Sequence, residues 1–169
     1  MYPKFEKVRY EVFKNSGLYR ELDDKTVKEI YDNIKLPQRA TSGSAGYDFF
    51  IPSTIGLEAG SELSIPTGIR CYMPDDMVLL IFPRSGLGIK SRVQLNNTCA
   101  IIDADFYNSD DGGHIWISII NDNRKGLPVT IPAGKGFCQG IFTKFYTTEE
   151  DNVSGTRNGG FGSTDGDSV

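Results

Sequence analysis

The chain has 169 residues, of which 38% are hydrophobic and 24% are charged, and its formal net charge is −4. This length is typical of one domain whose core is large enough to fold without disulfides or metal ions. The acidic balance disfavours binding of nucleic acid across a broad basic surface. No apolar run approaches the roughly 20 residues that span a bilayer, and the charged first residues lack the apolar stretch of a secretory signal. We therefore expect a cytoplasmic protein without a membrane or nucleic-acid partner.

Cysteine and histidine residues are few and widely spaced. Cys71, Cys99 and Cys138 form no CxxC pair, which disfavours a zinc knuckle and a disulfide framework. His114 is the single histidine, so an HExxH zinc site is excluded and a Ser-His-Asp triad has little room. A small anionic ligand remains compatible with the composition, because a few placed cations and backbone amides suffice to bind it.

The N-terminal region contains one strand pattern and one helix pattern. Residues 8–13 alternate in polarity and predict a strand. Farther along, Asp23 and Asp24 are suitable N-caps and Pro37 ends the segment, so we expect a helix at about 23–35. Its apolar face consists of four residues at helical spacing, Val27, Ile30, Tyr31 and Ile34.

From residue 47 onward, short runs rich in β-branched and aromatic residues are separated by turn clusters. The 19 glycines and 8 prolines also favour many turns. The pattern predicts an all-β sandwich or barrel in a single domain at 1–146, with the helix as an insertion. The predicted strands are 47–51, 62–65, 78–82, 114–120, 129–131 and 137–145.

The segment 147–169 is polar and rich in glycine, and by itself it buries too little surface to become ordered. One interpretation is a mobile tail. However, Arg157 and Phe161 lie among the glycines, and a cation with a lone aromatic ring suits a flap that closes over a phosphate ligand.

Three other segments carry chemically useful groups, and each also has a purely structural interpretation. The run PRSGLG at 83–88 offers backbone N–H groups, a hydroxyl and a guanidinium to phosphate oxygens, although it is no P-loop and could equally be a turn. Asp103 and Asp105 would share one face of a strand and perform acid–base work, or form a polar strand end. Asp48 could orient metal-bound water or stand in a turn.

Five motifs follow one another along the chain: SAGYD (44–48), PRSGLGIK (83–90), the run from Asn97 through IIDADF (101–106), Gly134 with CQGI (138–141), and RNGGFGST (157–164). Each motif alone is weak, but together and in this order they resemble the trimeric dUTPase family. The resemblance implies a jelly-roll β fold and a homotrimer whose active sites are each shared by three subunits. It also implies Mg²⁺-dependent hydrolysis of dUTP to dUMP and pyrophosphate.

The resemblance further implies roles for individual residues. Asp103 matches the aspartate that holds the deoxyribose 3′-hydroxyl and activates the water that attacks the α-phosphorus. Asn97 matches the uracil-reading hairpin, and Asp48 matches the carboxylate that contacts metal-bound water. Four residues match positions that bind the phosphates: Arg84, Ser85, Gly86 and Gln139. The fifth motif matches a flap that closes over the substrate, in which Phe161 stacks on uracil, and its other matching residues are Arg157, Gly162, Ser163 and Thr164.

Several positions depart from the family pattern. Phe106 stands where the family usually has a tyrosine under the sugar, and its ring still predicts steric exclusion of a ribose 2′-hydroxyl. Tyr107 and Asn108 replace an Arg-Gly pair, and the 107–113 insertion alters the rim of the uracil pocket. Gly136 stands where the fourth motif commonly has arginine. The helix at 23–35 is additional.

Two alternatives differ from this activity. dCTP deaminases share the fold, but their chemistry needs a glutamate in the strand at 114–119, which has none here. A regulatory or interaction protein would keep the fold and bind an unspecified protein partner through the additional helix and the 107–113 insertion.

Overall fold

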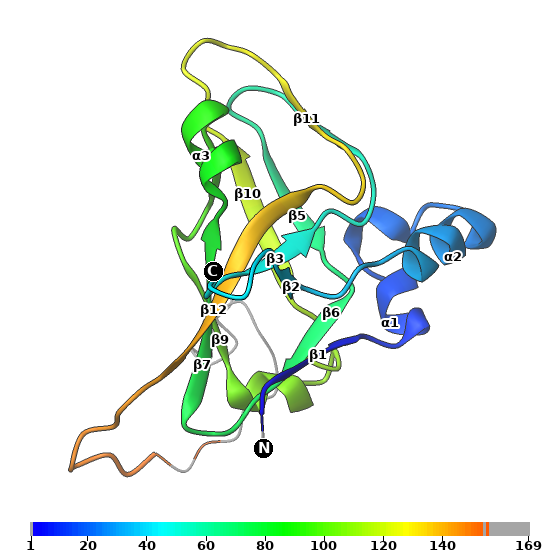
Figure 1. Ribbon diagram of the computed structural model, residues 1–169. Coiled ribbons are helices and arrows are strands. Elements are labelled where there is room, and N and C mark those ends of the chain that lie inside the picture. The colour runs from blue at the N-terminus through cyan, green and yellow to red at the C-terminus, as the bar shows by residue number, and fades with distance from the viewer. Residues whose placement is uncertain (1, 154, 156–169) are drawn as a thin grey trace.

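The computed structural model describes residues 2–153 and 155, and strands dominate its regular structure (Figure 1). One sheet has five antiparallel strands in the order β2–β3–β12–β7–β9. Its strands are β2 (Gln38–Arg39), β3 (Tyr47–Phe50), β7 (Met77–Pro83), β9 (Ala100–Asp103) and β12 (Gly136–Lys144).

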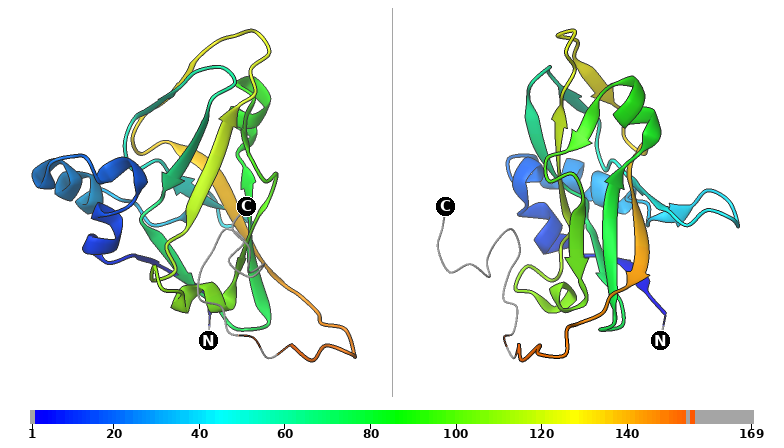
Figure 2. Two further views of the ribbon diagram at one scale, coloured as in Figure 1. Left: turned by 180° about the vertical axis from the view of Figure 1, so that it is seen from behind. Right: turned by 90° about the vertical axis from the view of Figure 1, so that its left-hand side faces the viewer.

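A second sheet stands beside the first, as the side view in Figure 2 shows, and its strand order is β5–β10–β8. Two further strand pairs, β1–β6 and β4–β11, extend the structure. This layered arrangement of antiparallel strands confirms the predicted jelly-roll-like sandwich. The strands are β1 (Lys4–Lys7), β4 (Ile55–Leu57), β5 (Glu62–Pro66), β6 (Ile69–Tyr72), β8 (Val93–Leu95), β10 (Trp116–Asn121) and β11 (Val129–Ile131).

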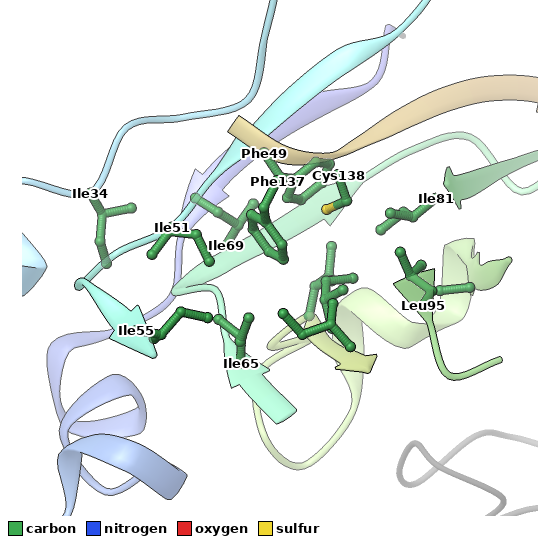
Figure 3. Packing of buried hydrophobic residues seen from close by; sticks show 14 of the residues in the cluster. Ile34, Phe49, Ile51, Ile55, Ile65, Ile69, Ile81, Leu95, Phe137 and Cys138 are labelled. Carbon is green, nitrogen blue, oxygen red and sulfur yellow. The ribbon is translucent and has the colours of Figure 1, made fainter. Parts of the chain in front are cut away.

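The core lies between the sheets and is built by alternation along the strands. Along β10, Ile117 and Ile119 are buried while their neighbours are partly exposed. Phe49, Phe137 and Ile81 from the other sheet belong to the same buried cluster, and Figure 3 shows these three residues gathered in the core. Each fully buried side chain of this size contributes about 1.5–3 kcal/mol through the hydrophobic effect, so the core holds the sheets together.

The predicted helix is confirmed as α2 (Asp24–Asp32). Its N-cap is Asp23, whose Oδ1 accepts a hydrogen bond from the Thr26 backbone N–H at 3.0 Å. Val27 is fully buried, and the Tyr31 hydroxyl donates to the Val8 carbonyl at 2.6 Å. The additional helix is therefore packed against its own chain.

The strand predicted at 8–13 is wrong. The strand β1 ends at Lys7, and the chain then forms the short helix α1 (Tyr10–Lys14). Both Tyr10 and Phe13 contact the ring of Tyr31, at centroid distances of 5.3 and 5.6 Å. Tyr10 and Phe13 are three residues apart and therefore lie on one face of a helix. Their packing on Tyr31 favours the helix over the strand that the short alternation in polarity predicts.

Three short helical segments were not predicted: η1 (Gly17–Tyr19), α3 (Ser85–Lys90) and η2 (Ala104–Asn108). The remaining strands were predicted to within a few residues or missed where they are short. None of the helices in the described part of the chain has the length and apolarity needed to cross a membrane.

The buried histidine generates a prediction about pH and stability. His114 is 1% exposed, and its Nε2 accepts a hydrogen bond from the Gly68 backbone N–H at 2.9 Å. Burial lowers the pKa of His114 to about 4. Because the unfolded-state pKa is near 6.5, the unfolded chain takes up a proton between about pH 6.5 and 4 that the native chain excludes. The free energy of unfolding therefore falls as the pH decreases through this window.

We expect this histidine to cost about 2 kcal/mol of stability between pH 7.5 and pH 5. Urea unfolding at both pH values measures the loss. In His114→Gln, whose amide oxygen can accept the same N–H without titrating, the loss should shrink by that amount. An identical pH dependence in wild type and variant would contradict the assignment.

Candidate active site

Three of the predicted site residues meet where strands β3, β7 and β12 lie side by side. In the strand register, Gln139 on β12 is opposite Asp48 on β3 and Phe82 on β7. Arg84 follows β7 directly, and its Nε lies 3.1 Å from Asp48 Oδ1 in an ion pair. The Gln139 amide donates to the Pro83 carbonyl at 3.5 Å. The first, second and fourth motifs are therefore joined by sheet pairing.

Two glycines make room for these polar side chains. A Cβ atom at Gly136 would lie 2.5 Å from Nη1 of Arg84, and a Cβ at Gly46 would lie 2.7 Å from Oε1 of Gln139. Gly136 is one of the departures from the family pattern, and here its missing side chain is the space that the guanidinium of Arg84 occupies. Arg84 also donates from Nη1 to the Gly136 carbonyl at 3.5 Å.

The second motif is partly helical rather than a loop. Arg84 is the N-cap of α3, and its carbonyl accepts from the Leu87 and Gly88 N–H groups at 3.1 and 2.9 Å. Ser85 and Gly86 open the helix and are exposed. The first N–H groups of a helix have no partner within it, so these amides are available to phosphate oxygens.

Asn97 lies in the turn between β8 and β9, where Thr98 has a φ of +64°. A cleft of about 280 Å³ opens beside this turn, and its other walls include Ala100 and, from β10, Trp116 and Ser118. The arrangement offers an amide and backbone groups at the edge of a pocket with an aromatic wall, which suits a small planar base.

The two aspartates of the third motif do not share a strand face, so that prediction is wrong. The strand β9 ends at Asp103, and Asp105 lies in the following segment η2. Asp103 is half-buried and Asp105 is exposed. Phe106, in the same segment, is 7% exposed and belongs to the core. The turn into η2 breaks the two-residue alternation that a continuous strand would have kept.

Within one chain, Asp103 and Arg84 lie far apart. In the register of β7 with β9, Asp103 is opposite Val78, whereas Arg84 follows Pro83 at the other end of β7. Arg84 is six residues from Val78, and at a strand rise of about 3.3 Å per residue this places Asp103 and Arg84 roughly 20 Å apart along the strand. Figure 1 shows α3 and the short helix after β9 at opposite ends of this sheet.

The flap residues of the fifth motif lie outside the described residues; they are Arg157, Phe161, Gly162, Ser163 and Thr164. Their predicted roles stay predictions, as do those of all the other site residues.

The ion pair between Asp48 and Arg84 was not predicted from the sequence. No local signal marks it, because only the pairing of β3, β12 and β7 brings the two positions together.

Comparison with known proteins gives a consistent result. The family model described as dUTPase matches residues 32–165. The deoxyuridine 5′-triphosphate nucleotidohydrolase of Lactococcus lactis is 36% identical over 134 residues, covering 78% of this chain and 88% of the relative. That of Haemophilus ducreyi is 38% identical over 147 residues, covering 79% of this chain and 92% of the relative.

Solved structures agree. The dUTPase from Streptococcus mutans has a TM-score of 0.66 at 29% identity, over 86% of this chain and 98% of that one. The dUTPase from phage phi11 of S. aureus, at 24% identity, shares the fold with a TM-score of 0.61 over 73% of this chain and 92% of that one. The fold and the motif order thus define a nucleotide hydrolase, and the chain belongs to the dUTPase family.

The space beside Gly136 is testable. The extra methyl of Gly136→Ala must displace the guanidinium of Arg84, a flexible side chain, while the strand itself can persist. We expect the variant to bind a non-hydrolysable analogue of dUTP about tenfold more weakly, since charged hydrogen bonds to phosphate depend on geometry. Isothermal titration calorimetry measures the affinity. Gly56→Ala is the matched control, because no atom of the described residues lies within 4 Å of a Cβ there. Equal affinity in both variants would refute the idea.

Proposed function

We propose that this protein hydrolyses dUTP to dUMP and pyrophosphate, with water attacking the α-phosphorus. The observation that carries the proposal is the family match at residues 32–165, a range that includes all five motifs. The clustering of Asp48, Arg84 and Gln139 supports it, because a guanidinium, an amide and helix-opening N–H groups suit a triphosphate. Phosphoryl chemistry of this kind needs positioning and charge neutralisation more than a covalent nucleophile.

In this proposal Asp103 is the general base. Its carboxylate would accept a proton from the attacking water and a hydrogen bond from the deoxyribose 3′-hydroxyl. A general base contributes typically about 10² to 10⁴ in rate. The turn beside Asn97 would read the uracil edge, and Phe106 would exclude a ribose 2′-hydroxyl by its bulk.

On the phosphate side, Arg84 and Gln139 would contact the phosphate oxygens together with the N–H groups of Ser85 and Gly86. The ion pair with Asp48 uses one Nε–H of Arg84. A guanidinium has five N–H donors, so others remain for phosphate. The flap at 157–164 would close over the γ-phosphate and uracil.

The residues present fit Mg²⁺ held mainly by the substrate. Within residues 2–153 and 155, no group of three or more His, Cys, Asp or Glu side chains could hold a metal ion. Mg²⁺ typically keeps several waters and binds through phosphates with one or two carboxylates. Asp48 pairs with Arg84 through Oδ1, and its other carboxylate oxygen can accept a hydrogen bond from a metal-bound water. Bound with the triphosphate, Mg²⁺ would neutralise part of its charge.

We further propose a homotrimer whose chains share each active site. The supporting observation is that Asp103 and Arg84 lie at opposite ends of β7. A base roughly 20 Å from the phosphate-binding group cannot act on the same α-phosphorus, whereas a second chain can supply the missing half. In a closed cyclic assembly every chain then gives its base to one site and its arginine to another.

The alternatives gain less support. Strand β10 (Trp116–Asn121) contains no glutamate that could serve the proton transfers of a deaminase. The 107–113 insertion is folded against its own chain, since Ser109 Oγ donates to the Phe106 carbonyl at 2.8 Å and accepts from the Gly113 N–H at 3.1 Å. A regulatory role with a protein partner stays a prediction.

The first test is release of pyrophosphate from dUTP, dCTP, dTTP and UTP by purified protein with Mg²⁺. We expect rapid release from dUTP and about 10²-fold slower release from UTP, because the bulk of the Phe106 ring would leave little room for the added 2′-hydroxyl. Comparable rates for dUTP and UTP would contradict the role of Phe106. No release from dUTP would overturn the proposed function.

A second test uses Asp103→Asn and Arg84→Gln. Each variant alone should lose most turnover, and Asp103→Asn should still bind the non-hydrolysable analogue. When the two are unfolded together and refolded as a mixture, about a quarter of wild-type activity should return, because one site in four combines an intact arginine from one chain with an intact aspartate from another. Absence of recovery in trimers shown to be mixed would place both groups in one chain.

A further inference from the structure

A charged and aromatic cluster links three elements next to the third motif. Glu6 on β1 and Arg70 on β6 are directly opposite each other in the strand register. Tyr107, in η2, lies across both: its hydroxyl donates to Glu6 Oε2 at 2.8 Å, and its ring centroid is 3.5 Å from the guanidinium carbon of Arg70. A second ring, Tyr72, meets Tyr107 edge-on at 5.7 Å.

The cluster is half-buried, so its contacts are less screened by water than those of a surface pair. The side chains of Arg70 and Glu6 are 21% and 32% exposed, and the Arg70 Nε lies 3.7 Å from Glu6 Oε2. Among the described residues that Nε is buried without a hydrogen-bond partner, and the guanidinium lies over the Tyr107 ring in a cation–π contact. Hydrogen bonds from Lys4 and Tyr107 lower the pKa of Glu6, so this carboxylate stays charged at neutral pH.

Tyr107 lies in the short segment η2, which begins next to Asp103, the proposed base. The segment η2 starts immediately after Asp103, which is its N-cap residue. Its far end is held by Ser109 and by Gly113, where a Cβ would lie 2.8 Å from the Tyr107 Cα. Between these points, Tyr107 contacts Glu6 and Arg70, and these contacts join η2 to the β1–β6 pair.

We propose that Tyr107, held by Glu6 and Arg70, is a positioning residue that sets the orientation of Asp103. The inference rests on the proposed function, in which Asp103 is the base. It goes beyond the family match, because Glu6 precedes the matched residues 32–165.

The test is steady-state kinetics with dUTP on variants that remove single contacts. Tyr107→Phe keeps the ring on Arg70 and loses the hydroxyl, and Glu6→Ala loses the acceptor. We expect each to lower kcat roughly tenfold with KM within about twofold, because misplacing a base affects the chemical step and spares binding. Glu6→Gln, which keeps an oxygen acceptor, should retain most of kcat. The double variant Tyr107→Phe with Glu6→Ala should be no slower than either single variant.

The matched control is Tyr10→Phe. The Tyr10 hydroxyl also donates to a carboxylate, Asp24 Oδ1 at 2.9 Å, but it lies between α1 and α2. Its kcat should equal that of wild type. The inference is overturned if Tyr107→Phe and Glu6→Ala have wild-type kcat, or if their kcat returns to the wild-type value once corrected for the folded fraction measured by circular dichroism. A wild-type protein that releases no pyrophosphate overturns the proposed function, and this inference with it.

Discussion

The antiparallel pairing of β7 with β12 on one side and β9 on the other is the constraint on which the site depends. The first pairing sets Gln139 beside Phe82 and so brings the second and fourth motifs together. The second sets Asp103 opposite Val78, at the far end of the same strand from Arg84. Because side chains alternate along strands, a shift of either register by one residue would turn these groups to the other face. The same strand thereby organises and separates the two groups of residues that we propose as halves of the site.

Space around the polar groups is as important as their identity. Gly46 and Gly136 leave room for the side chains of Gln139 and Arg84, since a Cβ atom at either position would lie 2.7 or 2.5 Å from them. Beneath them the sheet is apolar: Cys138, next to Gln139 on β12, is fully buried, and burial raises the pKa of its thiol. The phosphate-binding groups we propose therefore stand on a packed surface, which limits the positions that their side chains can take.

Prediction from the sequence succeeded where a local physical signal was strong. The cap at Asp23 and the helical spacing that follows it specify α2, and the alternation of apolar residues specifies most strands. It failed where the competing patterns were short. Residues 8–13 alternate, yet the aromatic pair Tyr10 and Phe13 packs as a helix on Tyr31. The sequence predicts a strand that continues past Asp103, but the chain turns into η2. A few residues carry too little periodicity to distinguish the two.

By itself, the sequence determined the family, the fold class and the residue types available for chemistry, because motifs in a given order and the alternation of apolar residues are properties of one dimension. Only the tertiary structure decided which of those residues meet. It paired Asp48 with Arg84, placed Asp103 at the other end of β7, and joined Tyr107 to Glu6, a residue 101 positions away in the chain. Such contacts depend on strand register and packing between distant segments, and no local stretch of sequence carries that information.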